Sequence, residues 1–263
     1  MTLDVIVTRA RGGTATKPPL VFVHGAWHGA WCWTEHFTEW FADRGYTSYA
    51  IDLRGHGDSD GDLRSSRIAH YVADLRKVVT HLDDDPILVG HSMGGFVVQH
   101  YMSIYPVRAS VLIAPVPVTG VIGATMRVAA RHPLAFLKTN ATLSLGPIVE
   151  DPQRARSLLF GASIDDDVAL GYAKRVQSES YIAYLEMIAD LPKRSKVINP
   201  VLVIGGTEDA LFSTPELRLT AAAYEAELTM IEGAGHNVML DVGWESAARR
   251  IDAWLGGLRT VNG

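Results

Sequence analysis

Cysteine is almost absent from this chain of 263 residues, and its scarcity limits the chemistry that the sequence can support. Cys32 is the only thiol, so an internal disulfide is excluded and a cysteine-based metal site is not expected. Its neighbours Trp31 and Trp33 favour a packed thiol over a reactive one.

The sequence also offers no convincing metal or cofactor motif. His24 and His28 are four residues apart, but a glycine-containing turn separates them, so they do not lie on one helix. The stretch DLRGHGDSDGD resembles a calcium loop, yet alanine occupies position 69, where that loop needs a bidentate glutamate. We therefore expect neither a metal nor a cofactor.

Long apolar runs and basic tracts are missing as well. The longest uncharged stretch, ASVLIAPVPVTGVIGATM, carries two prolines and two glycines and is unsuited to a membrane span. The amino terminus has an acid at Asp4 and no long apolar core before its arginines, unlike a secretory signal. With a net charge of −5, nucleic acid is not an expected partner. We expect a soluble cytoplasmic protein without a membrane span, and the sequence predicts no oligomeric state.

Short apolar runs recur along the chain and predict buried strands. They are nearly continuous in Val, Ile and Leu, as in strands covered on both faces. The runs cover residues 20–25, 48–53, 86–90, 110–114, 200–206 and 227–233, and residues 3–8 add an outer strand.

Amphipathic helices separate these runs. One apolar face runs from Ile68 to Leu82, with Ser65 or Ser66 available as its amino-terminal cap. Two further faces are formed by Trp33, Phe37, Trp40 and Phe41, ended by Gly45, and by Trp244, Ala248, Ile251 and Leu255. Alternating strands and helices predict an α/β fold, an open and mostly parallel sheet covered on both sides. In such sheets ligands bind at the carboxyl ends of the strands.

One region breaks the alternation. Residues 118–195 are helix-prone, lack a convincing strand and contain prolines at positions 133, 147 and 152. An excursion of this length between two strands indicates an inserted helical cap. We therefore expect a core of residues 1–117 and 196–263 and a cap of residues 118–195 that makes the pocket substantially apolar.

Gly90-His91-Ser92-Met93-Gly94 matches the pattern G-x-S-x-G, which turns a strand sharply into a helix with an exposed serine at the apex. The apolar run before it and the helix-like stretch after it supply the context that this motif needs. We interpret Ser92 as a nucleophile.

A serine hydroxyl needs a base, and the base needs a carboxylate to orient it. His236 follows the last predicted strand in a glycine-flanked loop, at the same sheet edge as Ser92, whereas His132 lies in the cap. Asp209, in the loop after residues 200–206, is the best candidate for the acid. Glu208 and Asp241 are weaker alternatives.

An oxyanion also needs hydrogen-bond donors. The backbone N–H of Met93 is one candidate, and that of Ala26, in the loop after residues 20–25, is the other. Trp27 and His28 in the same loop either face the pocket as substrate-binding residues or pack in the core.

Together, VHGAWHGAWCW, DLRGHGDSD, GHSMGG, GGTEDALF and GAGHNVML resemble the α/β-hydrolase superfamily, in its order and over nearly the whole chain outside the cap. The resemblance implies a mostly parallel sheet of about eight strands, a helical cap, a Ser92–His236–Asp209 triad, and an oxyanion hole formed by Ala26 and Met93. The first segment looks most like the methylesterase and hydroxynitrile lyase branch. Lyases of that branch generally carry threonine where this chain has Gly25, and lysine where it has Asn237, which favours the esterase side.

The sequence thus predicts a serine hydrolase that cleaves a small, largely apolar carboxylic ester through an acyl-enzyme. Alternatives within enzymes are lactone or carbon–carbon bond hydrolysis, acyl transfer, or lyase chemistry on the same triad. Outside enzymes, a ligand-binding receptor on the same fold is the alternative.

Overall fold

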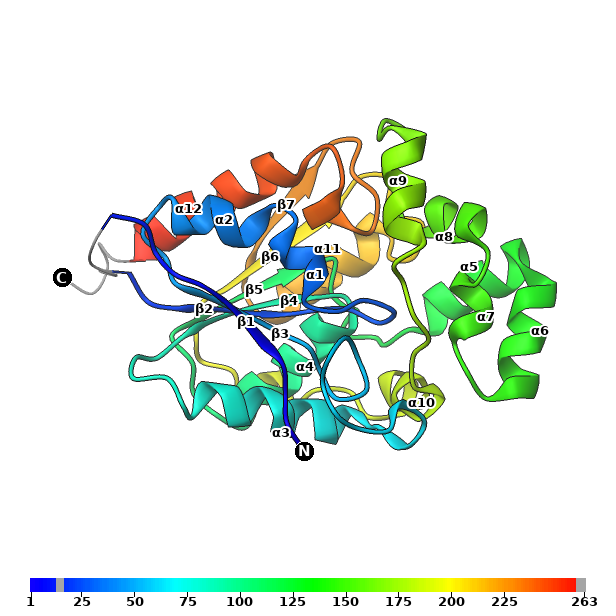
Figure 1. Ribbon diagram of the computed structural model, residues 1–263, viewed down its shortest axis with the longest axis horizontal. Coiled ribbons are helices and arrows are strands. Elements are labelled where there is room, and N and C mark those ends of the chain that lie inside the picture. Colours follow the sequence, from blue (N-terminus) through cyan, green and yellow to red (C-terminus); the bar gives the residue numbers. More distant parts are fainter. Residues whose placement is uncertain (13–16, 259–263) are drawn as a thin grey trace.

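The computed structural model describes residues 1–12 and 17–258, and its centre is a twisted sheet with helices on both faces (Figure 1). The strands lie in the order β1-β3-β2-β4-β5-β6-β7, and all neighbours pair in parallel except β1 with β3. Their bounds are β1 Val5–Thr8, β2 Leu20–Val23, β3 Ser48–Ile51, β4 Ile87–His91, β5 Ala109–Ile113, β6 Val201–Gly206 and β7 Glu227–Ile231. The predicted α/β fold, its six strands and the added outer strand are confirmed, with seven strands in the described residues where the resemblance implied about eight.

Burial explains why the inner strands are uniformly apolar. Every residue of β2, β4, β5 and β6 is buried, because helices cover both faces of a parallel sheet. The edge strand β7 differs from this prediction, since only Ile231 is buried along its length. The partly buried Thr229 of β7 instead contacts the last helix of the chain, because Arg250 Nε donates to Thr229 Oγ1 at 3.0 Å.

The flanking helices have the predicted apolar faces. Helices α2 (Phe37–Ala42) and α12 (Trp244–Leu258) lie on one side of the sheet, and α3 (Ile68–Val79) lies on the other (Figure 1). Helix α4 (Met93–Met102) packs against β4 and α3, and α11 (Thr214–Ala223) against β6 and β7. Cys32 is buried in the short helix α1 (Trp31–Thr34), where burial raises the pKa of its thiol.

The predicted cap of α3 is wrong. Ser65 belongs to a short 3₁₀ turn, η1 (Leu63–Ser65), and Ser66 Oγ donates to Asp62 O. The helix begins after Arg67, and its first N–H, that of Ile68, donates to the Glu186 carboxylate at 2.7 Å. A side chain from a distant helix thus does the work that a local serine was expected to do.

Residues 118–195, which we call the α5–α10 segment, connect β5 to β6 and lie beyond one end of the sheet (Figure 1). Its helices are α5 Ile122–Arg131, α6 Pro133–Thr142, α7 Gly146–Val149, α8 Pro152–Leu159, α9 Asp166–Ala173 and α10 Tyr181–Ala189. Two 3₁₀ turns occur later in the chain. The turn η2 (Arg194–Lys196) follows α10, and η3 (Val238–Leu240) follows the loop that contains His236.

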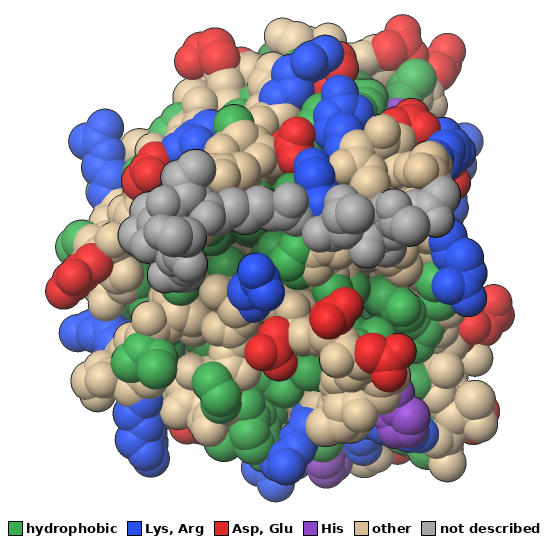
Figure 2. All heavy atoms as spheres, turned by 90° about the vertical axis from the view of Figure 1, so that its left-hand side faces the viewer, with side chains coloured by type: hydrophobic (Ala, Val, Ile, Leu, Met, Phe, Trp, Pro, Cys, Tyr) green, Lys and Arg blue, Asp and Glu red, His purple; other side chains and the backbone are tan. Residues whose placement is uncertain are grey.

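The end of the molecule opposite the α5–α10 segment carries acidic and basic side chains side by side (Figure 2). This mixture agrees with the small net charge of −5. Throughout residues 1–12 and 17–258, each helix is too short or too polar to span a bilayer.

Candidate active site

Ser92 sits at the sharp turn between β4 and α4. Its backbone has φ 51° and ψ −116°, a left-handed φ that is uncommon outside glycine. The turn is held because Ser92 N–H donates to Ile113 O, and Ser92 O accepts from the N–H groups of Phe96 and Val116, all at 3.1 Å. Such strain persists only where the surroundings impose it, as at a nucleophile elbow.

The two glycines of the motif are required by close approach. A Cβ on Gly94 would lie 2.3 Å from Val23 O and 2.4 Å from His24 O, and one on Gly90 would lie 2.6 Å from Gly94 O. Any side chain at either position would collide with backbone, so only glycine lets β4 turn into α4 beside β2.

The predicted histidine and acid are brought together. His236 Nδ1 lies 2.9 Å from Asp209 Oδ2, and both side chains are only 1% exposed. The other carboxylate oxygen of Asp209 accepts from the N–H groups of Leu211 and Phe212 at 2.7 and 2.9 Å. With the Nδ1 proton directed at the carboxylate, Nε2 carries the free lone pair of a base. That atom is buried and has no hydrogen-bond partner among the described residues.

The serine turn and the histidine loop meet through His91. Its Nε2 donates to His236 O at 3.1 Å, and the two imidazole centroids are 4.8 Å apart. The described hydrogen bonds do not include one between Ser92 and His236. The structure therefore places the two loops side by side without the Ser92–His236 hydrogen bond of the predicted triad.

The two predicted oxyanion donors both line one cavity with Ser92. Met93 begins α4, so its N–H has no carbonyl four residues back to bond. In the described part of the chain, neither the Met93 nor the Ala26 N–H donates a hydrogen bond to protein. Two unpaired donors beside a serine hydroxyl are the arrangement that can stabilise an oxyanion.

Of the two open substrate-binding candidates, the structure places Trp27 at the cavity and His28 elsewhere. Trp27 lines the cavity. His28 is 1% exposed, with Nδ1 2.7 Å from Ala26 O and Nε2 3.0 Å from Asn237 Nδ2. Both of its ring nitrogens are therefore occupied by protein, and burial lowers its pKa to about 4.

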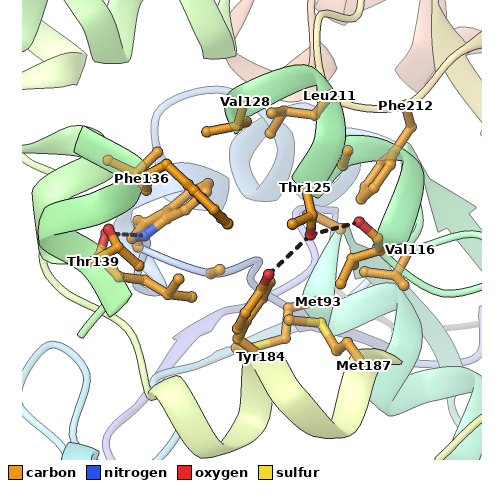
Figure 3. Close-up of a pocket in the computed structure, with 17 residues that line it drawn as sticks. Met93, Val116, Thr125, Val128, Phe136, Thr139, Tyr184, Met187, Leu211 and Phe212 are labelled. Carbon is orange, nitrogen blue, oxygen red and sulfur yellow. Dashed lines mark hydrogen bonds between the residues drawn. The ribbon is translucent and has the colours of Figure 1, made fainter. Parts of the chain in front are cut away.

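The cavity is small and mostly apolar (Figure 3). Its volume is about 80 Å³, several times the roughly 10–15 Å³ that one water needs. The α5–α10 segment supplies most of the wall: Val121, Ala124, Thr125, Val128, Phe136, Thr139, Leu145, Ile148, Tyr184 and Met187. Val116, Leu211 and Phe212 complete the side nearest the strand ends.

Sequence reasoning missed the polar groups in this wall. Thr125 Oγ1 donates to Val121 O at 2.9 Å and lies 3.0 Å from Tyr184 Oη (Figure 3). Because the threonine proton is already used, the tyrosine donates to Thr125 and keeps its own lone pairs for a ligand. From the sequence, only the four-residue spacing of Val121 and Thr125, one turn apart on a helix, could indicate the first of these hydrogen bonds. The pairing with Tyr184 crosses 59 residues.

No group of three or more His, Cys, Asp or Glu side chains within the described ranges is arranged to hold a metal ion. The groups that the structure brings to the site are the serine, the imidazole, the carboxylate and the backbone N–H groups named above.

Comparison with known proteins identifies the family. The model described as "Alpha/beta hydrolase family" matches residues 20–250, so this chain belongs to the alpha/beta hydrolase family. Relatives include methylesterase 3 of Arabidopsis thaliana, 37% identical over 101 residues (37% of this chain and 38% of the relative). Norfluorocurarine synthase 2 of Strychnos sp is 32% identical over 144 residues, 54% of this chain and 50% of that protein. The chain matches half or less of the length of these two curated relatives.

Solved structures share the fold. The monoacylglycerol lipase of Paleococcus ferrophilus superposes with a TM-score of 0.75 at 22% identity, covering 98% of this chain and 100% of that one. The esterase EaEST of Exiguobacterium antarcticum gives 0.76 at 18% identity, with coverage of 97% and 95%. The predicted resemblance to α/β hydrolases of the methylesterase type is confirmed by the family match and the curated relatives.

Proposed function

We propose that this protein is a serine esterase that hydrolyses a small, largely apolar carboxylic ester. One observation carries the proposal: a buried imidazole, oriented by Asp209, has a free Nε2, and its loop meets the strained turn of Ser92 through His91. Methylesterases among the relatives support the same reaction.

The proposed reaction has two halves. Ser92 Oγ attacks the ester carbonyl while His236 Nε2 takes its proton, and the N–H groups of Ala26 and Met93 bind the oxyanion. The tetrahedral intermediate collapses as His236 returns the proton to the departing alcohol, leaving an acyl group on Ser92. Water then attacks that acyl group with His236 again as base. The bond between Ser92 Oγ and the acyl carbon breaks as His236 returns the proton to Oγ, and the carboxylic acid leaves.

We further propose that residues 118–195 act as a cap on a core formed by residues 1–117 and 196–263. The support is that most of the cavity wall comes from the α5–α10 segment, and that this wall is mainly aliphatic and aromatic. Such a wall favours an apolar substrate because its binding removes apolar surface from water.

Lyase chemistry on the same scaffold is disfavoured at Gly25. A Cβ at this position would lie 2.7 Å from His91 Nδ1 and 2.9 Å from Ser92 Cβ. The threonine that lyases of the resembling branch carry there has no room in this chain. Product analysis in ¹⁸O-labelled water separates the two, since a hydrolase places solvent oxygen in the released acid and a lyase does not.

The test of the proposal is labelling with an alkyl fluorophosphonate, followed by hydrolysis of p-nitrophenyl esters of increasing chain length. We expect the probe on Ser92, an initial burst of p-nitrophenol from acyl-enzyme formation, and faster turnover of short acyl chains. Ser92→Ala should lower kcat by about 10³-fold or more.

Ser103→Ala is the matched control, because Ser103 ends the same helix and only donates to His100 O at 2.8 Å. It should label and turn over like the wild type. Comparable turnover by the Ser92 variant would refute the nucleophile. A wild-type chain that binds esters but neither labels nor hydrolyses them would favour the receptor alternative.

A further inference from the structure

The turn that carries the Ala26 N–H is strained. His28 N–H donates to Gly25 O at 3.3 Å, so residues 25–28 form a β-turn, and Trp27 occupies its third position with φ 69°. Glycine or asparagine is usual there, and a bulky residue with positive φ is an outlier. Relaxing Trp27 to negative φ would rotate the Ala26–Trp27 peptide and break the contact of Ala26 O with His28 Nδ1 at 2.7 Å.

The α5–α10 segment holds Trp27 in this conformation at two points. The backbone N–H of Gln177 donates to Trp27 O at 2.8 Å, and the indole Nε1 of Trp27 donates to Leu145 O at 3.3 Å. In Figure 1 the connection from α9 to α10, which contains Gln177, runs beside the loop that follows β2. One contact fixes the backbone of Trp27, and the other fixes its side chain.

The Gln177 side chain in turn fastens this connection to the core. Its Nε2 donates to Gly55 O at 3.0 Å, and its Oε1 accepts from Gly57 N at 3.2 Å. A primary amide is suited to this bridge because it offers a donor and an acceptor on one group. Gly55 and Gly57 belong to the loop after β3. This loop therefore determines where the Gln177 N–H lies, and through that N–H it determines where Trp27 lies.

We propose that Gln177 is a positioning residue for the oxyanion donor of Ala26, an inference that rests on the proposed esterase function. Gln177 lies outside the set of residues that line the cavity, so it acts through Trp27 and not on the substrate. Its contribution is to hold Trp27 in place, and with it the turn of residues 25–28 that carries the Ala26 N–H.

The test compares Gln177→Leu with Asn140→Leu. The first removes both side-chain hydrogen bonds to the loop after β3. The second removes an amide that bonds only within the α5–α10 segment, to Phe136 O at 2.7 Å and Tyr181 Oη at 2.7 Å. We measure kcat and KM for a short p-nitrophenyl ester, and inhibition by a short alkyl trifluoromethyl ketone, which adds to the serine to form an oxyanion.

Gln177→Leu should lower kcat by about 10–100-fold, less than the roughly 10²–10³-fold loss on deleting an oxyanion donor. KM should stay within about twofold, and the ketone should bind more weakly by a factor similar to the fall in kcat. Asn140→Leu should change none of the three values. Equal losses in the two variants, or an unchanged ketone affinity in Gln177→Leu, would overturn the proposal.

Two further variants keep the test decisive if Gln177→Leu does not fold. Gln177→Glu retains an acceptor for the Gly57 N–H but sets a carboxylate oxygen against Gly55 O, so it should also lower kcat and ketone affinity. Trp27→Phe removes the bond to Leu145 O, shortens one side chain of the cavity wall and should also lower ketone affinity. A wild-type protein without turnover would contradict the proposed esterase function. Full activity in both variants would contradict only the positioning role of Gln177.

Discussion

Two buried carboxylates, Asp209 and Asp241, lie near His236, and they differ in the groups that donate hydrogen bonds to them. Asp209 Oδ2 meets the imidazole. Asp241 instead accepts from backbone, with Oδ2 2.8 Å from the N–H groups of both Gly161 and Gly235 and Oδ1 2.7 Å from that of Val242. Asp241 thus ties the α8–α9 connection to the histidine loop, which makes Asp209 the carboxylate suited to orient the base.

Asp209→Asn should lower kcat by about 10²–10⁴-fold, because the amide donates where the carboxylate accepted and favours the wrong imidazole tautomer. Asp241→Asn should instead lower the free energy of unfolding by about 1–3 kcal/mol, since one amide oxygen cannot replace both carboxylate oxygens for three N–H groups. Steady-state kinetics and urea unfolding of both variants provide the measurement. A stable Asp209 variant with full activity would remove the acid from the mechanism.

The sequence predicted that Ser92, Asp209 and His236 lie at one edge of the sheet, because each follows a strand whose apolar run is clear. Side-chain direction within the loop after β2 was not predictable in the same way. Trp27 faces the cavity and His28 does not, and the reason lies in Asn237, Leu145 and Gln177, which are more than one hundred residues away. Local pattern carries no information on such contacts.

At the scale of elements, strands were predicted better than helix ends. Strands inside the sheet are buried, and their runs of apolar residues show this in the sequence. The start of α3 instead depends on Glu186 of α10. That carboxylate also pairs with Arg67 at 2.7 Å, on the residue before the helix. A distant cap of this kind leaves no local trace, so the serines beside the helix misled the prediction.

Glu186→Ala should therefore destabilise the protein by about 0.5–2 kcal/mol, the range for losing a helix cap. The comparison is Glu245→Ala, which removes an exposed ion pair with Arg249 four residues on and should cost less than about 0.5 kcal/mol. Urea denaturation of both variants measures the difference. Equal midpoints would show that Glu186 does not cap α3.

At the scale of the whole molecule, a fully buried histidine–carboxylate pair joins the core to the α5–α10 segment. His56 Nε2 lies 2.9 Å from Glu179 Oε2, and Tyr71 Oη donates to Oε1 of the same carboxylate at 2.8 Å. Burial opposes protonation of His56, but Glu179, together with the Arg54 carbonyl and Asp52, outweighs burial and raises the pKa of His56. Burial lowers the pKa of His24, His28 and His91.

The raised and the lowered pKa values have opposite effects on the free energy of unfolding as pH falls. A raised His56 pKa adds stability that is complete below the unfolded value near 6.5 and is lost as pH rises through the folded value. His24, His28 and His91, whose pKa values are lowered most by burial, bind protons only on unfolding, so they reduce stability as pH falls below about 6.5. In the wild type, His56 partly offsets that loss.

Glu179→Gln removes this offset, because His56 keeps its burial and loses its counter-charge. Its free energy of unfolding should fall more steeply than that of the wild type between about pH 8 and pH 5.5. Urea midpoints across that range, with Glu245→Gln as control, measure the two slopes. Parallel curves for the wild type and the Glu179 variant would contradict the role of the pair.

Helix α10 belongs to two parts of the molecule at once. Its residues Tyr184 and Met187 line the cavity, while Glu186 holds the amino end of α3. It is also the last helix before the chain returns to β6. A chimaera that borrowed the whole of residues 118–195 from another hydrolase would lose the anchor of its own α3. Borrowing only residues 118–176 would replace eight of the 17 residues that line the cavity and leave that anchor, together with Gln177, in place.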